Sequence, residues 1–488
     1  MGAPAGGSER GGSAPGAPTA VERPAPADLD RSVTARMAAW ATAVGEGGIP
    51  EDLSHVVAHR LLDYLGNLLG GADQPSVARL ARYASRFPGE VPLPGGSSSS
   101  SEQAALVYGA AAHAIESDDT HQPSSTHPGA VVFSTLLPLA SVTGSEWPSV
   151  VRAAVVGYEV MGRLGRASGP AGEYARGFHP TGTVGAFAAA AAAGMLRGAG
   201  QEQLTDALGI AGSLSSGSMS YLTNGSWTKH LHPGWAAHGG MIATDLGLDG
   251  YRGPDRVLER PHGYFAGHSD APDPAAAVAA LGSRPYVIER TSLKAHGCCR
   301  YEQAAIDGIL ELRRRHGVGP DDVARVRVGV LAAGWDIIAA PADRKRRPAN
   351  AVDAQFSMPF GAAVALLYGR ASRHEHTEAH LRDPRVMSLM DRVECFQDPA
   401  LDAEFPATWP AIVELQLRDG RALSVRVDHP KGDPENPLSF DEVAAKVDEV
   451  ASQVDERGRA GVIEAVRALP ETGDVAGVRD ALRTAWPR

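Results

Sequence analysis

The sequence predicts a mainly α-helical protein, in which a large all-helical domain carries a smaller inserted α+β domain. Apolar residues recur at helical spacing from about residue 29 to residue 285. The period-two alternation typical of half-buried strands follows after Arg284. The first region contains neither βαβ alternation nor a GxGxxG sequence, so a dinucleotide-binding fold is not supported.

Length and composition exclude several classes of protein. A chain of 488 residues with 43% hydrophobic residues is long enough for roughly two to three domains. Its net charge of -11 argues against general nucleic-acid binding. Only three cysteines are present, and their spacing matches neither zinc nor iron–sulfur sites, which predicts a reduced, cytoplasmic setting. The longest apolar run, residues 184–196, is shorter than the roughly 18 residues that a membrane span requires.

The composition divides the chain into four segments. Residues 1–28 are rich in Gly, Pro, Ala and Ser without an apolar run, and predict a disordered tail and not a signal peptide. Residues 29–285 form the first part of the all-helical domain, and residues 286–430 form the α+β domain. Residues 431–488 return to helix and are expected to pack back on the helical domain.

Each element has a local reason in the sequence. One helix opens at 49–52, because proline suits a first helical turn and acids stabilise its amino end, and Gly70–Gly71 stops it. Further helices are expected over residues 102–115, 130–142, 150–164, 183–196, 204–211, 235–245, 303–314 and 360–367. Strands are expected over residues 286–288, 323–331, 412–417 and 423–427, the last two joined by a hairpin turn at 418–421.

A dense polar loop, His113–Gly129, interrupts the apolar helices. Its seventeen residues include three histidines, three carboxylates, two threonines and three serines. Histidine beside Asp or Glu is the usual supply of groups that exchange protons near neutral pH. We therefore interpret the loop as the wall of a pocket, with an exposed, solvated loop as the alternative.

Two later segments contain residues that suit the opposite wall. In residues 176–183, His179 precedes a helix whose amino end, with Thr181, could bind an anion. In residues 224–234, Lys229 accompanies His230 and His232, a cationic cluster that could hold a carboxylate. A metal is disfavoured there, because no acidic partner has a recognisable spacing.

A third segment, residues 294–303, joins the helical region to the α+β domain. Cys298 within it could act as a nucleophile, but no Cys–His–Asn pattern accompanies it. A small buried thiol is the simpler interpretation.

These motifs together resemble the MmgE/PrpD family, which includes 2-methylcitrate dehydratase and cis-aconitate decarboxylase. The resemblance extends from about Leu29 to the carboxyl-terminal helices and rests on eight pieces in the family's order. They are LLDYLG at 61–66, the loop at 113–129, RGFHPTG at 176–182, KHLHPG at 229–234, GPD at 253–255, CCRY with Ile306-Asp307, AQFSMP at 354–359 and NPLS at 436–439.

The resemblance implies a large helical domain formed by both ends of the chain, a smaller α+β lid, and an active site between them. It also implies a homodimer that works without a metal or an organic cofactor. The family's pocket residues correspond to Glu116, Thr120, His127, His179 and Lys229.

The chain departs from the family pattern at one position. A histidine is expected about ten residues after Lys294, but Gln303 stands there, with Glu302 beside it. Glutamine cannot exchange a proton at neutral pH. Either another group, such as His296, replaces the histidine, or the reaction differs.

The chemistry that these groups suit is elimination next to a carboxylate. A base removes the α-proton while an acid protonates the leaving hydroxyl, or carbon dioxide departs and the carbanion is protonated. His127 and His179 are the predicted acid/base pair, oriented by Glu116, Asp118 or Asp119. The predicted substrate-binding residues are Thr120, Thr181, Lys229, His232, His296 and Gln303.

The predicted function is a cofactor-independent lyase, first of all a dehydratase acting on a small, 2-methylcitrate-like polycarboxylate. The Ala/Arg/Gly-rich composition fits a high-GC genome, where such enzymes can be recruited to specialised metabolism. A decarboxylase and an isomerase or epimerase are alternatives with the same proton chemistry. A non-catalytic binding or assembly subunit is another alternative, for which Gln303 is the main support. A carboxylate substrate is expected, but neither nucleic acid nor a membrane as partner.

Overall fold

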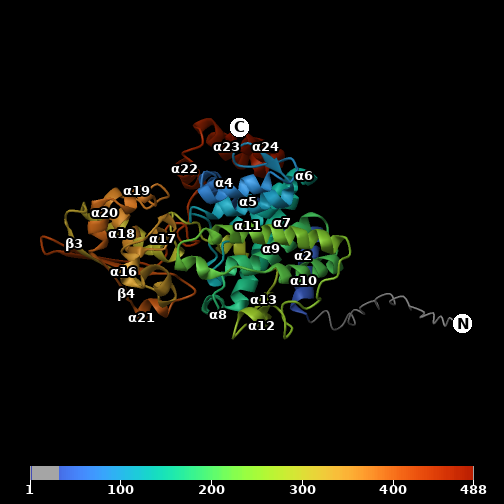
Figure 1. Ribbon diagram of the computed structural model, residues 1–488, viewed down its shortest axis with the longest axis horizontal. Helices are drawn as coiled ribbons and strands as arrows, with labels where there is room; N and C mark the ends of the chain where they lie inside the picture. The colour runs from blue at the N-terminus through green and yellow to red at the C-terminus, as the bar shows by residue number, and fades with distance from the viewer. Residues whose placement is uncertain (1, 3–31, 487–488) are drawn as a thin grey trace.

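The structure is a computed structural model that describes residue 2 and residues 32–486. Apart from Gly2, the predicted tail at residues 1–28 lies outside the described residues. Helices dominate the rest, which confirms the mainly α class (Figure 1). Within residues 32–486, no helix is both long and apolar enough to cross a bilayer.

A bundle of helices forms one part of the molecule, on the right of Figure 1. Its longer helices are α2 (Val33–Gly47), α3 (Leu53–Gly71), α4 (Pro75–Ala84), α5 (Ser101–His113), α6 (Pro128–Thr143), α7 (Trp147–Ser168), α9 (Pro180–Leu196), α10 (Gln201–Leu214) and α11 (Thr228–Leu248). The carboxyl-terminal helices α22 (Phe440–Val450), α23 (Glu456–Thr472) and α24 (Val475–Ala485) pack against α3 and α6. One hydrophobic core includes side chains from residues 33–293 and 443–486.

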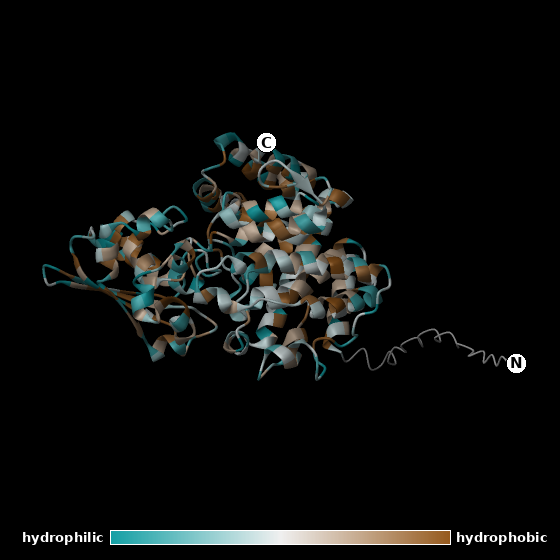
Figure 2. Ribbon diagram, in the orientation of Figure 1, coloured by the Kyte–Doolittle hydropathy of each residue, from teal (hydrophilic) through white to brown (hydrophobic). Residues whose placement is uncertain are grey.

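A four-stranded sheet with its own helices forms the other part, on the left of Figure 1. The strand order is β4 (Val393–Gln397), β3 (Val323–Val330), β5 (Ala411–Leu417) and β6 (Ala422–Val427), with β3 and β4 parallel and the other pairs antiparallel. Helix α14 (Gln303–His316) packs on β5 and β6, and α18 (Met358–Tyr368) packs on α14. A second hydrophobic core gathers side chains from residues 298–417 and Tyr221. Figure 2 shows hydrophobic residues within both parts.

Two local predictions are wrong, and one strand was not predicted. Residues 286–288 form no strand but belong to a 3-10 helix, Val287–Arg290, because the Glu289 carboxylate accepts from the Tyr286 N–H and buried Glu159 accepts from the Val287 N–H. Helix α11 begins at Thr228 and not at residue 235, so Lys229 and His232 lie on its first turns. Strand β4 was not predicted, because its five residues are too few to show a period.

Glycines let α11 approach its neighbours closely. A Cβ atom on Gly234 of α11 would lie 2.1 Å from the carbonyl oxygen of Leu106 in α5, and one on Gly109 of α5 would lie 2.5 Å from Gly234 Cα. A Cβ on Gly240 would lie 2.3 Å from the Ala189 Cβ of α9. The backbones of α5, α9 and α11 therefore meet almost directly. Their packing brings the carboxyl end of α5 beside the amino end of α11.

We expect Gly234→Ala to lower the free energy of unfolding by about 2–3 kcal/mol, because its methyl group would overlap the α5 backbone. Urea unfolding followed by circular dichroism measures the change. Gly461→Ala is the matched control: Gly461 lies within α23 with no atom near its missing Cβ. Because alanine favours helix, this variant should gain about 0.5–1 kcal/mol. Equal effects at the two positions would contradict the packing described here.

Candidate active site

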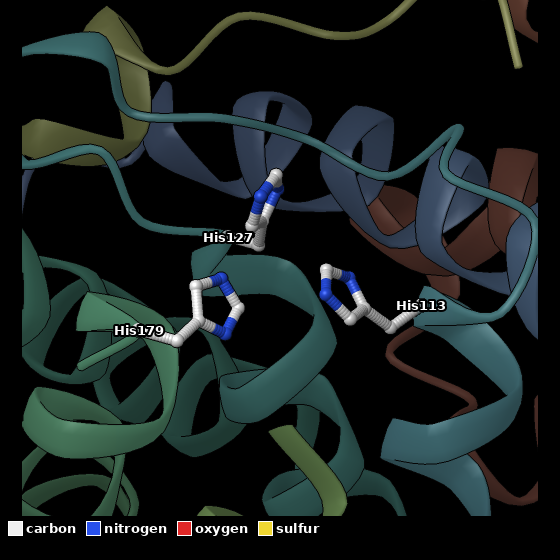
Figure 3. Close-up of side chains that lie close together, drawn as sticks. All are labelled: His113, His127 and His179. Carbon is white, nitrogen blue, oxygen red and sulfur yellow. The ribbon is translucent and has the colours of Figure 1, made fainter. Parts of the chain in front are cut away.

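Three buried histidines meet where α5, α6 and α9 come together (Figure 3). His113 ends α5, while His127 and His179 stand directly before α6 and α9. Their ring centroids are 4.8 Å apart for His113 and His127, 5.8 Å for His113 and His179, and 6.1 Å for His127 and His179. The structure thus brings together the two predicted acid/base residues and adds His113, which was not among the predicted site residues.

The local sequence explains how the two predicted rings reach this point. His127 and His179 are each followed by a proline that occupies the first turn of the helix, where a missing N–H costs nothing. Thr181 stabilises the arrangement, because its Oγ1 accepts from the His127 N–H at 3.1 Å. Thr181 therefore holds the backbone of the loop.

Each histidine has its Nδ1 atom in a hydrogen bond. His113 Nδ1 lies 2.6 Å from Asp118 Oδ2, and His127 Nδ1 lies 2.7 Å from the carbonyl oxygen of Asp119. A carbonyl oxygen can only accept, so His127 Nδ1 must carry the hydrogen. In the neutral ring, His127 Nε2 therefore bears a free lone pair and can accept a proton.

His179 has another imidazole as its partner. His179 Nδ1 lies 3.0 Å from His232 Nδ1, so one of the two atoms carries a hydrogen and the other accepts it. His232 was predicted to bind substrate, but it lies behind His179 and controls which tautomer His179 adopts.

Burial keeps His127 and His179 neutral at pH 7. It lowers the pKa of His127 to about 3, although nearby Asp118 opposes the shift. Burial also lowers the pKa of His179 well below its usual range, and the neighbouring His232 and the positive charge of Lys229 add to the effect. A neutral imidazole with a free Nε2 is suited to act as a base.

Two buried lysines share one carboxylate beside the histidines. Glu116 forms ion pairs with Lys229 and with Lys294, whose Nζ lies 3.2 Å from Glu116 Oε2. Burial alone would raise the pKa of Glu116, but the two lysines hold it below its usual range. Lys294 also lies 3.5 Å from Asp118, and these two carboxylates raise its pKa despite burial. Both carboxylates are therefore ionised at pH 7.

A small cavity of about 40 Å³, enough for a few water molecules, opens onto these groups. Five predicted residues line it: Glu116, Thr120, His127, His179 and Lys229. Lys294 and Arg300 complete the polar wall, while Tyr301, Phe356 and Trp409 come from the second hydrophobic core. Both parts of the molecule thus contribute to the cavity.

Asp119 does not line the cavity. Its carboxylate accepts from the Gly129 N–H at 2.9 Å and from Tyr158 Oη at 2.6 Å, and thereby fixes the start of α6. Burial raises its pKa to about 7. The carboxylate that lies among the histidines is instead Asp118, 2.6 Å from His113 and 3.5 Å from His127.

Gln303 and His296 also lie outside the cavity lining. The Gln303 side chain accepts from the His296 N–H and donates to the His296 carbonyl oxygen, both at 3.0 Å. His296 Nε2 lies 2.8 Å from Asp307 Oδ1. Gln303 therefore closes the turn at 296–303 through backbone contacts and transfers no proton.

His113, Asp118 and Lys294 are the functional candidates for which the sequence offered the weakest signals. His113 and Asp118 belong to the polar loop, but their spacing did not separate them from its other polar residues. Lys294 stood out only through the family resemblance.

The three imidazoles are close enough to share a metal ion, since one ligand atom from each lies within 4.8 Å of the others. Lys229 and Lys294 add positive charge at the same place, as their effect on the His127 pKa indicates. Glu116 and Asp118 offset this charge, so the three imidazoles could serve either as metal ligands or in proton transfer.

Two family models together match most of the chain. The MmgE/PrpD N-terminal domain matches residues 35–277, and the MmgE/PrpD C-terminal domain matches residues 296–470. The cis-aconitate decarboxylase-like protein oryM of Aspergillus oryzae is 28% identical over 477 residues, which cover 91% of this chain and 96% of oryM. Cis-aconitate decarboxylase of Aspergillus terreus is 25% identical over 486 residues, which cover 95% and 98%. A 2-methylcitrate dehydratase of Cupriavidus necator is 28% identical over 156 residues, 30% of this chain and 31% of that protein. The chain belongs to the MmgE/PrpD family.

Proposed function

We propose that the protein is a cofactor-independent lyase that removes water from a small, 2-methylcitrate-like polycarboxylate. The observation that carries the proposal is the free Nε2 of His127, on a neutral ring that lines a cavity with two lysines. The family relatives named as decarboxylases and dehydratases support the class of reaction.

His127 is the base in this proposal. Its Nε2 accepts the proton from the carbon next to a substrate carboxylate, and negative charge develops on that carboxylate. Lys229 and Lys294 stabilise this charge, because a cation in a buried site acts at short range with little screening. Glu116 holds both ammonium groups in place before the substrate arrives.

His179 positions the leaving hydroxyl. When His232 donates its Nδ1 hydrogen to His179 Nδ1, His179 carries its own hydrogen on Nε2 and can donate it in a hydrogen bond to that hydroxyl. The proton that His127 took from carbon then passes to the hydroxyl as the C–O bond breaks. Water departs, the C=C bond forms, and both imidazoles are neutral again.

Decarboxylation is the second candidate. The two fungal relatives named cis-aconitate decarboxylase or decarboxylase-like match more than 90% of the chain, whereas the dehydratase matches about 30% of it. In that reaction a C–C bond breaks, carbon dioxide leaves, and a proton taken up from solvent reaches the resulting carbanion through His179 without a base. An isomerase or epimerase would use His127 as a base but would release neither water nor carbon dioxide. The retained polar wall opposes a non-catalytic role.

We expect the protein to convert citrate or 2-methylcitrate to an unsaturated acid without releasing carbon dioxide. Ultraviolet absorbance follows the double bond, and cis-aconitate tests for carbon dioxide release. His127→Ala and His179→Ala should each lower kcat by about 10²–10⁴-fold. His262→Ala, at an exposed histidine, is the control and should leave kcat unchanged.

Other outcomes separate the candidates. Carbon dioxide from cis-aconitate, with a larger loss in His179→Ala than in His127→Ala, would favour the decarboxylase. Absence of turnover, together with no thermal shift from any polycarboxylate, would contradict the lyase.

We expect the contribution of His127 to the free energy of unfolding to decrease as the pH is lowered. Below about pH 6.5 the unfolded imidazole binds a proton, while the folded ring stays neutral down to about pH 3, so acid favours the unfolded state. His127→Asn keeps a donor for the Asp119 carbonyl but cannot take up the proton. The unfolding free energy of wild type relative to this variant should therefore drop by about 1.4 kcal/mol per pH unit between pH 6.5 and 5. Urea titrations at each pH measure it, and a constant difference would rule out a neutral His127.

A further inference from the structure

A second set of hydrogen-bond donors belongs to the cavity wall on the side of the second hydrophobic core. Arg300 Nε, Tyr301 Oη and Trp409 Nε1 are buried, and none has a hydrogen-bond partner among the described residues. We propose that these donors form a subsite for a second carboxylate of the substrate. This inference rests on the proposed function and specifies its substrate class.

The three donor residues form one contiguous stretch of wall. The rings of Tyr301 and Trp409 are stacked, with centroids 4.2 Å apart and an interplanar angle of 14°. The guanidinium carbon of Arg300 lies 6.0 Å from the Trp409 ring centroid. The three side chains are between 3% and 9% exposed, so bulk water does not satisfy them.

Neighbouring groups leave these donors available. The Arg300 guanidinium is anchored by its Nη2, which donates to buried Asp433, while its Nε remains unpaired. Ser125 is the polar neighbour of the Tyr301 hydroxyl and lowers the Tyr301 pKa, against the larger rise that burial causes. The Ser125 hydroxyl also forms a 2.5 Å hydrogen bond with Tyr174 Oη, and a carboxylate would be a stronger acceptor for Tyr301 than this shared hydroxyl.

The donor chemistry selects the ligand. Arginine and tryptophan nitrogens can only donate, so the group that binds them must accept. A carboxylate offers two oxygens with about four lone pairs, enough for three donors, whereas a carbonyl or hydroxyl oxygen offers two. Burying a donor without a partner is costly, and such groups in native proteins commonly mark a functional site.

The consequence is a substrate that carries at least two separated carboxylates. One lies beside Lys229 and Lys294 next to the histidines, and the other accepts from Arg300, Tyr301 and Trp409. Of the two lysines, Lys229 lies in the helical part and Lys294 in the segment that follows it. Tyr301 and Trp409 belong to the second hydrophobic core, and Arg300 directly precedes Tyr301. The substrate would thereby bridge the two parts of the molecule.

Binding of two unreactive acids tests the subsite without requiring turnover. Propane-1,2,3-tricarboxylate has no hydroxyl to lose, and isobutyrate is the same skeleton with both terminal carboxylates replaced by hydrogen, so it has no second carboxylate. Calorimetry should show tighter binding of the tricarboxylate to the wild type. Tyr301→Phe and Trp409→Phe should each weaken binding of the tricarboxylate about ten-fold and leave binding of isobutyrate unchanged, because each removes a donor to a charged acceptor.

Trp486→Phe is the matched control. The Trp486 Nε1 is also buried without a partner among residues 32–486, but Trp486 does not line the cavity. The affinity of the Trp486→Phe variant for both acids should equal that of the wild type. Tyr301→Phe removes only a hydroxyl that forms no bond within the described chain, so its melting temperature without ligand should not fall.

The remaining outcomes contradict the subsite. They are equal affinity of the wild type for both acids, no binding of either acid, unchanged tricarboxylate affinity in both variants, and equal weakening of both acids. If the tricarboxylate binds as expected but no substrate turns over, the chemistry assigned to His127 fails and the subsite stands.

Discussion

The close approach of α5, α9 and α11 is the constraint on which the site depends. Side chains at Gly109, Gly234 or Gly240 would hold these helices apart by more than an ångström, since each added Cβ would overlap a neighbouring helix. With the backbones in contact, His113 at the end of α5 faces residues at the starts of α9 and α11. The polar groups are therefore gathered by the packing of small residues elsewhere in these helices.

Buried charge then determines the protonation states. Two lysines and two carboxylates lie beside the histidines, and their charges balance within the cavity wall. With this balance, desolvation dominates at His127 and His179 and keeps them neutral. A net negative wall would instead protonate the rings and remove the base.

Helical spacing and family motifs were enough to predict most of the longer helices, the hairpin of β5 and β6, and five residues that line the cavity. They could not predict the direction in which individual side chains point. Asp118 and Asp119 are adjacent, yet one lies among the histidines and the other turns toward Tyr158, a difference set by long-range packing. Likewise Gln303 was predicted to bind substrate, whereas its amide binds backbone atoms of its own turn.

The backbone of Glu116 shows what this arrangement costs. Its φ of 54° lies in the left-handed region, which residues other than glycine occupy at an expense of about 1–2 kcal/mol. Glycine at this position would relieve the strain but take the carboxylate away from two buried lysines, and removing one partner of a buried ion pair costs about 3–5 kcal/mol. That cost exceeds the strain, so the ion pairs with Lys229 and Lys294 hold the backbone of residue 116 in this conformation. Position 116 is accordingly one where a local backbone cost is offset by charges that lie far away in the sequence.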